Sequence, residues 1–258
     1  MMLDKVGSYS FLTAPFHCDF SNRIFLSNLG NSLLNAADFH SNERNFGMHY
    51  LNTIHKTWVL SRLSIEIIEM PQAYSSYLVE TWVDGVMRGF THRNFRVIDA
   101  LSGKIYAYGR SIWAMIDTET RQPTDLLAVN DGLIVDYIER EKECDMQPFS
   151  RVKIEKDARL RQTVLTHYSD VDPNGHINSI KYVEHLLNLW SIEWYQQHDI
   201  KRLDVAYVAE SHCGDRLHYY VGEQEKGTFA IAIKKEEPMG EEQIEVCRLK
   251  LTFAKKPV

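Results

Sequence analysis

The residues whose types could do chemistry are concentrated in one short segment, 170–178. Its polar members are Asp170, Asp172, Asn174, His176 and Asn178. Pro173 and Gly175 lie among them, so the backbone is expected to turn there rather than to continue a strand. A carboxylate, an amide and an imidazole at this spacing could orient a water molecule or hold a polarised carbonyl group.

A helix is expected to follow this segment directly. Ile180, Val183, Leu187, Trp190 and Trp194 recur at spacings of three and four, which places them on one helix face. The helix would begin inside the polar segment. Its first free N–H groups and the positive end of its dipole would then face whatever the polar residues bind.

The remaining elements repeat in the same order in both halves. The first half predicts a helix over 28–46 and strands over 58–68, 77–83, 93–98 and 105–116. The second half predicts a strand over 161–168, the long helix, and strands over 204–210, 216–223, 228–235 and 243–254. This order indicates an internal repeat of structure.

Two such halves, each a long helix beside an antiparallel sheet, are typical of two hotdog units in tandem, an α+β double hotdog. We expect a first unit over residues 1–116, a linker over 117–150 and a second unit over 151–258. A register that pairs Trp58 with Val205 places Leu29 where the second half has His176. The same register places Ser27 at the position of Asn174 and Leu63 at that of Glu210. The second unit is therefore predicted to be catalytic, and the first to supply a wall of an apolar pocket.

Composition narrows the function classes. The chain has 258 residues, of which 44% are hydrophobic and 25% are charged, and no apolar run is long enough to span a membrane. The start of the sequence lacks the pattern of a signal or transit peptide, so a cytoplasmic location is expected. The formal net charge of −6 with no basic stripe argues against a nucleic-acid partner.

A metal site is not expected. The segment D-V-D-P-N-G resembles the start of an EF-hand loop, but the residue at the twelfth position of that loop is Lys181 rather than Glu. No H-E-x-x-H spacing occurs, and the four cysteines are scattered without a C-x-x-C pair. The sequence thus predicts no metal, no cofactor and reduced thiols.

Several ordered segments resemble one family. D-V-D-P-N-G-H-I-N-S-I-K-Y at 170–182 is similar to the D-x-D-x-N-x-H-x-N-N-x-K-Y pattern of the acyl-acyl-carrier-protein thioesterases of plants and bacteria. The segments W-V-L-S-R, T-W-V, R-N-F-R-V-I-D and S-I-W-A-M of the first half also look like family segments, in the right order. The resemblance runs nearly end to end. It implies a double-hotdog fold and hydrolysis of the thioester of fatty acyl-acyl carrier protein (acyl-ACP), which terminates fatty-acid elongation.

The resemblance also implies a set of site residues. The family's catalytic Asp, Asn and His carry over onto Asp172, Asn174 and His176, and its catalytic Glu, in a Y-x-x-E segment, onto Glu210. The chain departs from the plant pattern after Glu210, because Ser211 follows and the Cys comes two residues later. An alignment on that Cys would place His212 at the Glu position; we prefer Glu210 because Y-x-x-E then stays intact. Ser179 replaces the second Asn of the N-N pair, and no plastid-targeting segment is present, which favours a bacterial-type enzyme.

Each site residue has an expected role. Glu210, expected on a strand, would activate water as a general base or attack directly as a nucleophile. His176 and Asn174 would position the water or the carbonyl group, and Asp172 would orient them. Backbone N–H groups of Gly175, Ile177 and Asn178 would stabilise the oxyanion. Asp170 and Asn178 could equally serve as turn and capping residues.

Three functions remain open from the sequence. The first is acyl-ACP hydrolysis, with an acyl carrier protein as the partner. The second is a hotdog dehydratase or hydratase, which leaves the thioester intact, and the third is a non-catalytic acyl-thioester binding protein. A double unit contains internally what a single hotdog obtains by dimerising, so both a monomer and a homodimer are compatible with the sequence.

Overall fold

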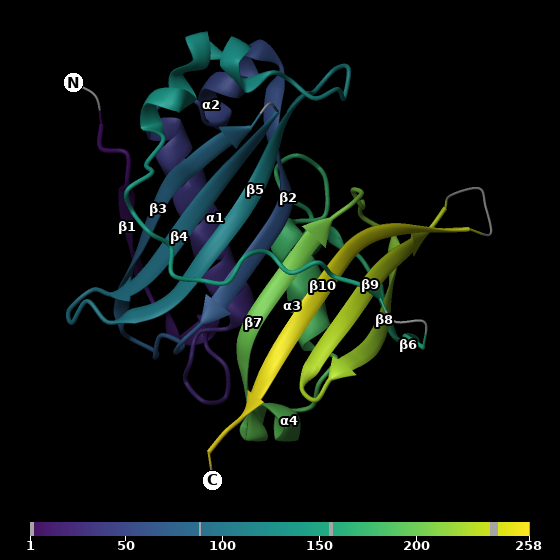
Figure 1. The fold of residues 1–258 in the computed structure, drawn as a ribbon. Coiled ribbons are helices and arrows are strands. Elements are labelled where there is room, and N and C mark those ends of the chain that lie inside the picture. Colours follow the sequence, from purple (N-terminus) through teal and green to yellow (C-terminus); the bar gives the residue numbers. More distant parts are fainter. Residues whose placement is uncertain (1–2, 88, 155–156, 238–241, 258) are drawn as a thin grey trace. The chain divides into compact units, whose positions relative to one another are not determined.

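Each half of the chain folds as a strand, a helix and four further strands (Figure 1). The computed structural model describes residues 3–87, 89–154, 157–237 and 242–257. The chain divides into two units, Met1–Gln147 and Pro148–Val258. Among the described residues, no helix combines the length and the apolar character needed to cross a membrane.

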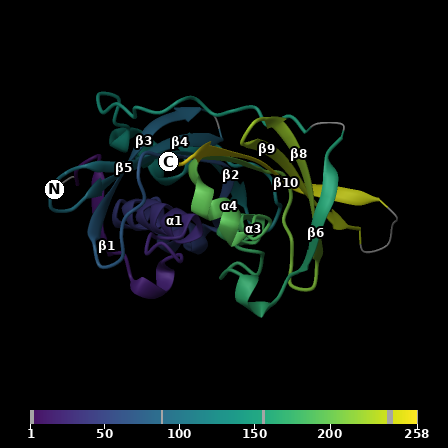
Figure 2. The same cartoon turned by 90° about the horizontal axis from the view of Figure 1, so that it is seen from below.

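The first unit is one antiparallel sheet with a long helix. Its strands are β1 (Gly7–Leu12), β2 (Lys56–Ile67), β3 (Ser76–Met87), β4 (Phe90–Asp99) and β5 (Ile105–Asp117). They lie in the order β1-β3-β4-β5-β2, and each neighbouring pair is antiparallel. The helices are α1 (Leu26–Glu43) and the short α2 (Met48–Leu51), with 3-10 turns η1 (Pro15–His17), η2 (Asn52–Ile54), η3 (Leu126–Ala128) and η4 (Asn130–Tyr137). α1 lies along one face of this sheet (Figure 2) and buries Leu29 and Leu33 completely.

The second unit repeats this plan. Its elements are β6 (Arg159–Leu165), η5 (Tyr168–Asp170), α3 (Ser179–Leu187), α4 (Ile192–Gln197), β7 (His198–Tyr207), β8 (Arg216–Glu225), β9 (Thr228–Glu236) and β10 (Gln243–Lys255). The strand order β6-β8-β9-β10-β7 matches that of the first unit strand for strand, and every pair is again antiparallel. The predicted internal repeat and the double-hotdog fold class are confirmed. β1, which the sequence analysis did not predict, is the counterpart of β6.

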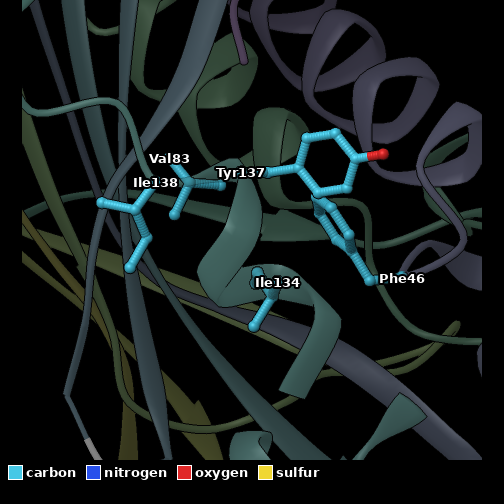
Figure 3. Packing of buried hydrophobic residues seen from close by; sticks show 5 residues of the cluster. All are labelled: Phe46, Val83, Ile134, Tyr137 and Ile138. Atoms are coloured by element: carbon cyan, nitrogen blue, oxygen red, sulfur yellow. The ribbon is translucent and has the colours of Figure 1, made fainter. Parts of the chain in front are cut away.

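Residues 117–147 pack on the first unit instead of bridging the two halves as a surface linker. Figure 3 shows Ile134, Tyr137 and Ile138 in a buried cluster with Phe46 and Val83. Two further buried clusters continue this packing, one with Leu126 and Val129 and one with Cys144 and Met146. Their apolar side chains explain why the first unit extends to Gln147, well beyond the predicted bound at residue 116.

The predicted long helix of the second unit is interrupted. α3 ends at Leu187, and α4 begins at Ile192, where the Ser191 side chain accepts a hydrogen bond from the Trp194 N–H and so caps a new helix. The predicted apolar face is nevertheless correct. Trp190 and Trp194 pack edge-to-face or tilted against Phe229 and Phe253, with ring centroids 5.1 to 5.9 Å apart. Packing on the sheet thus continues across the break.

The strand that leads to Glu210 also differs from the prediction. β7 begins at His198 and ends at Tyr207, so it starts and stops earlier than the expected strand over 204–210. Glu210 therefore lies in the loop that follows β7, three positions past its end, and not on a strand as expected. A loop position frees its backbone from the sheet ladder and lets neighbouring loops set its orientation.

Candidate active site

The segment 170–178 forms a tight reversal of the chain that ends at the start of α3. Val171 and Ile177 form an antiparallel bridge, and the Gly175 N–H donates to the Asp172 carbonyl oxygen at 3.0 Å. Pro173 occupies the second position of this turn, which its fixed φ favours, and Gly175 follows with a φ of +84°. Only a residue tolerant of the left-handed region fits there without strain. The Pro and Gly of the motif thus set the geometry of the residues between and beside them.

The Asp172 carboxylate holds this turn from inside. Its Oδ1 atom accepts the backbone N–H of Asn174 at 2.9 Å and that of His176 at 3.2 Å. Its Oδ2 atom lies 3.5 Å from the Asn174 side-chain Nδ2 atom. Asp172 therefore fixes the backbone of Asn174 and of His176 within the turn, and its orienting role in the reaction stays a prediction.

Asn178 and Asp170 serve the start of α3. The Asn178 side chain accepts the Ile180 N–H at 2.9 Å and caps the helix. Asp170 is buried and accepts the His167 N–H at 2.9 Å, and its Oδ1 atom lies 3.2 Å from His185 Nε2. Both residues thus fill the capping and turn roles that the sequence left open for them.

A second loop, residues 208–215, faces the first. His212 to Asp215 form a turn closed by the Asp215 N–H and the His212 carbonyl oxygen at 3.1 Å, with Gly214 at a φ of +93°. The Asp215 carboxylate accepts the His212 N–H at 2.9 Å and the Lys235 Nζ atom at 3.0 Å. The Thr166 hydroxyl donates to the His212 carbonyl oxygen at 2.7 Å. The loop is thus tied to Thr166, which directly follows β6, and to Lys235 of β9.

Direct contacts join the two loops at the predicted site residues. The Ile177 N–H donates to the Ser211 carbonyl oxygen at 2.8 Å. This brings His176 Nε2 to 3.3 Å from Glu210 Oε2, with 26% of the His176 side chain and 35% of the Glu210 side chain exposed. Asp172, Asn174, His176 and Glu210 are therefore brought together, and the carboxylate and imidazole remain accessible to water. The arrangement can activate a water molecule beside a polarised carbonyl group.

Tyr207, the aromatic residue of the Y-x-x-E segment, anchors the same region from β7. Its hydroxyl donates to the Ser179 carbonyl oxygen at 2.9 Å, at the first residue of α3. Burial raises the pKa of the Tyr207 phenol well above its usual value. The phenol therefore stays protonated and keeps donating to the helix start.

The predicted oxyanion role of backbone N–H groups is not supported by their hydrogen bonds. The N–H groups of Gly175, Ile177 and Asn178 donate to the carbonyl oxygens of Asp172, Ser211 and Asp170, respectively, at 2.8 to 3.0 Å. Groups already satisfied in this way cannot also bind a developing oxyanion. This part of the prediction is wrong for the described geometry: these N–H groups hold the loops together.

One residue near the site had no role in the sequence-based prediction. The ring of His212 lies 5.1 Å from that of His176, centroid to centroid, at an interplanar angle of 73°. From the sequence, His212 was only an alternative occupant of the Glu210 position. The local signal was the departure from the family pattern in E-S-H-C-G-D.

The first unit has the same loop frame, but at other positions than the predicted register. Its Cys18–Ile24 bridge corresponds to Val171–Ile177, and Asp19 accepts the N–H groups of Ser21 and Arg23 as Asp172 accepts those of Asn174 and His176. The Ile24 N–H donates to the Pro71 carbonyl oxygen as the Ile177 N–H donates to that of Ser211, so Arg23 and Met70 stand where the second unit has His176 and Glu210. The predicted counterparts Leu29, Ser27 and Leu63 were wrong, because the loops before the helices and the strands do not share one offset; these three residues are buried in α1 and β2.

Within the described part of the chain, no group of three or more His, Cys, Asp or Glu side chains is arranged to hold a metal ion. All four cysteines are free thiols.

A helix packed on an antiparallel sheet, with an acid, an amide and an imidazole before the helix, is the hotdog architecture with a polar site at the helix N-terminus. Residues 5–132 match the family model described as the acyl-ACP thioesterase N-terminal domain, and residues 153–253 match the C-terminal domain. The chain belongs to the acyl-ACP thioesterase family, and the resemblance found in the sequence is confirmed.

Known proteins extend this match over nearly the whole chain. A crystal structure of an acyl-ACP thioesterase from Bacteroides thetaiotaomicron is 46% identical, covers 97% of this chain and 98% of its own, and superposes with a TM-score of 0.88. A 12:0-ACP thioesterase from Umbellularia californica is 18% identical with a TM-score of 0.83, which shows a shared fold. A chloroplastic acyl-[acyl-carrier-protein] hydrolase of Cuphea viscosissima is 24% identical over 155 residues, 59% of this chain. That match spans 38% of the plant protein's length.

Proposed function

We propose that the protein hydrolyses the thioester of fatty acyl-ACP, releasing a free fatty acid and the carrier protein and so terminating fatty-acid elongation. The observation that carries the proposal is the 3.3 Å approach of His176 Nε2 to Glu210 Oε2, on two loops tied together by hydrogen bonds. Membership of the thioesterase family supports the choice of reaction.

In the proposed reaction Glu210 acts on water. Its carboxylate accepts a proton from a water molecule as the oxygen of that water attacks the thioester carbonyl carbon. His176, within reach of the same carboxylate, orients the water, and the Asn174 amide donates toward the carbonyl oxygen. Asp172 holds both of these groups through their backbone N–H groups. Collapse of the tetrahedral intermediate breaks the C–S bond, and the leaving thiolate takes up a proton.

Direct attack by Glu210 is the other route to the same products. The carboxylate would then form an acyl anhydride with the fatty acid, which water would cleave in a second step. Single-turnover hydrolysis in ¹⁸O-labelled water tests for the anhydride. Incorporation of the label into the peptide that contains Glu210 shows an anhydride cleaved at the Glu210 carbonyl carbon, whereas label in the fatty acid alone fits both a general base and an anhydride cleaved at the acyl carbon.

Thiol release from a panel of acyl-ACP and acyl-coenzyme A thioesters, from medium to long chain, tests the reaction itself. We expect release from carrier-bound substrates by the unaltered protein and loss of release in His176→Ala and Glu210→Gln. If calorimetry shows that the thioester binds and no thiol is released, the protein is a binding protein and not an enzyme. If the product is an intact thioester whose acyl chain has lost or gained water, the protein is a dehydratase or a hydratase.

Three further parts of the proposal have their own measurements. We propose that the first unit supplies a wall of the acyl pocket, which substitutions in its core would test through altered chain-length preference. The protein is expected to be a monomer or a homodimer, which sedimentation distinguishes. Cytoplasmic residence, also expected from the sequence, is checked by cell fractionation.

A further inference from the structure

We propose that His212 is a positioning residue, which holds the His176 imidazole in the rotamer that faces Glu210. The proposal rests on the hydrolysis proposed above and adds a specific device to it. His212 and His176 lie on different loops, and their rings meet edge-to-face with centroids 5.1 Å apart. An aromatic pair at this distance and angle is attractive and directional.

His212 can act as a support because its own backbone is held on both sides. Its N–H donates to the Asp215 carboxylate at 2.9 Å, and its carbonyl oxygen accepts from the Thr166 hydroxyl at 2.7 Å and from the Asp215 N–H at 3.1 Å. The Lys235 ammonium in turn holds the Asp215 carboxylate at 3.0 Å. Thr166 is buried, so the anchor belongs to the body of the second unit. An exposed residue with a backbone fixed to this degree presents its side chain in a defined place.

His176 is the group that needs such support. Its backbone is fixed by Asp172, but its side chain is 26% exposed and its ring torsions are set by what the ring touches. The Glu210 carboxylate contacts one edge of the ring, at Nε2. The His212 ring adds a second contact from the other loop. Glu210 and His212 both belong to this second loop, and two contacts restrict the rotation of the ring more than one contact alone would.

The position of His212 follows from the segment after Glu210, where the sequence departs from the plant family pattern. Ser211 is fully buried, and its carbonyl oxygen accepts the Ile177 N–H. The next residue must therefore leave the core, and the turn closed at Asp215 directs it back over the first loop. A histidine at this point extends over His176, whereas the Cys213 that follows lies exposed in the turn.

Two substitutions at residue 212 test the proposal. His212→Ala removes the ring, and we expect kcat for thioester hydrolysis to fall about tenfold while KM changes less than about twofold, because orientation rather than binding is lost. His212→Phe keeps an aromatic edge without imidazole nitrogens, and we expect it to restore kcat to within about threefold of the unaltered protein. Unchanged thermal unfolding would show that both variants fold.

The imidazole NMR signals of His176, assigned with His176→Gln, give a readout independent of turnover. We expect them to move in His212→Ala, because the ring current of residue 212 is lost, and to show more than one rotamer. His198→Ala is the matched control: it removes another ring-stacked histidine of the same unit, 3.9 Å from Trp194, and should change neither kcat nor the His176 signals.

Several outcomes would overturn the proposal. Unaltered kcat in His212→Ala, or unmoved His176 signals, would show that the ring contact does not hold His176. A His212→Phe variant as slow as His212→Ala would assign the effect to the imidazole nitrogens instead of to the ring edge. If the unaltered protein releases no thiol at all, the proposed hydrolysis fails, while the NMR comparison still decides whether His212 orients His176.

Discussion

Ile177 and Ser211 are joined by a main-chain hydrogen bond of 2.8 Å, and this bond aligns the two loops that carry the candidate site. His176 precedes the donor by one position, and Glu210 precedes the acceptor by one position. The bond therefore sets the separation between the imidazole and the carboxylate. Geometry fixed by the backbone in this way does not depend on a bound substrate.

Glu210→Gln should abolish most of the activity without unfolding the protein. The amide keeps the shape of the side chain but cannot accept a proton, so we expect kcat to fall about 10²- to 10⁴-fold. Steady-state thiol release measures this. Glu225→Gln, at the exposed end of β8, is the matched control and should retain full activity. If the kcat of Glu210→Gln is within tenfold of that of the unaltered protein, Glu210 does not take part in the reaction.

Substitution of Asp172 should separate orientation from chemistry. Asp172→Ala leaves the N–H groups of Asn174 and His176 without their acceptor. We expect about 1 kcal/mol loss in the free energy of unfolding and at least a tenfold loss in kcat. Asp172→Asn retains one oxygen acceptor. Its free energy of unfolding and its kcat should lie between those of Asp172→Ala and those of the unaltered protein. Urea unfolding and thiol release give the order, and equal activity of all three proteins would contradict the orienting role.

Gly175→Ala should strain the turn that presents His176. A Cβ atom at residue 175 meets no atom within 4 Å, but the φ of +84° is unfavourable for any L side chain. We expect about 1 kcal/mol loss in the free energy of unfolding, together with reduced kcat.

Gly85→Ala is the matched control for that change. Its Cβ atom also meets nothing within 4 Å, and Gly85 does not have a positive φ. We therefore expect unchanged or slightly increased stability. If both variants are equally stable, the left-handed conformation of Gly175 carries no cost.

Stability below pH 6.5 should depend on His40 of the first unit. Burial lowers the pKa of His40 from 6.5 to about 2, and its Nε2 atom donates to the Lys5 carbonyl oxygen at 3.0 Å. As the pH falls through 6.5, the unfolded chain binds a proton that the folded chain does not. The free energy of unfolding should therefore decrease by about 1.4 kcal/mol per pH unit over this range.

Urea unfolding at pH 6.5, 5.5 and 4.5 tests this pH dependence. His40→Gln removes the titrating group and should flatten the decline, although it lowers stability at pH 6.5. His55→Gln, an exposed histidine paired with Glu119, should leave the decline as steep as before. A decline equally steep in His40→Gln would assign the dependence to other groups.

Local features of the site were predictable from the sequence, and contacts between distant segments were not. Pro173 and Gly175 predicted the turn, and the apolar spacing after Asn178 predicted the helix, because both depend on neighbouring residues. Glu210 was placed by resemblance, and its loop position follows from where β7 stops pairing with β10. No local pattern specifies that end point.

The incorrect predictions have the same physical origin. Whether an N–H group is free for an oxyanion depends on every acceptor nearby, and for Ile177 that acceptor is a residue of another loop. The break before α4 depends on the Ser191 cap, which competes with the apolar periodicity that suggested one helix. The contact between His176 and His212 likewise exists only after the two loops are joined.

The identical strand order of the two units is the arrangement expected when one ancestral unit is duplicated. Every hydrogen bond described above that positions Asp172, Asn174 and His176 begins and ends within the second copy. The first copy keeps Asp19 at the position of Asp172, but Arg23 and Met70 stand at those of His176 and Glu210. The site is thus self-contained in the second copy, while the first copy carries different side chains on the same loop frame.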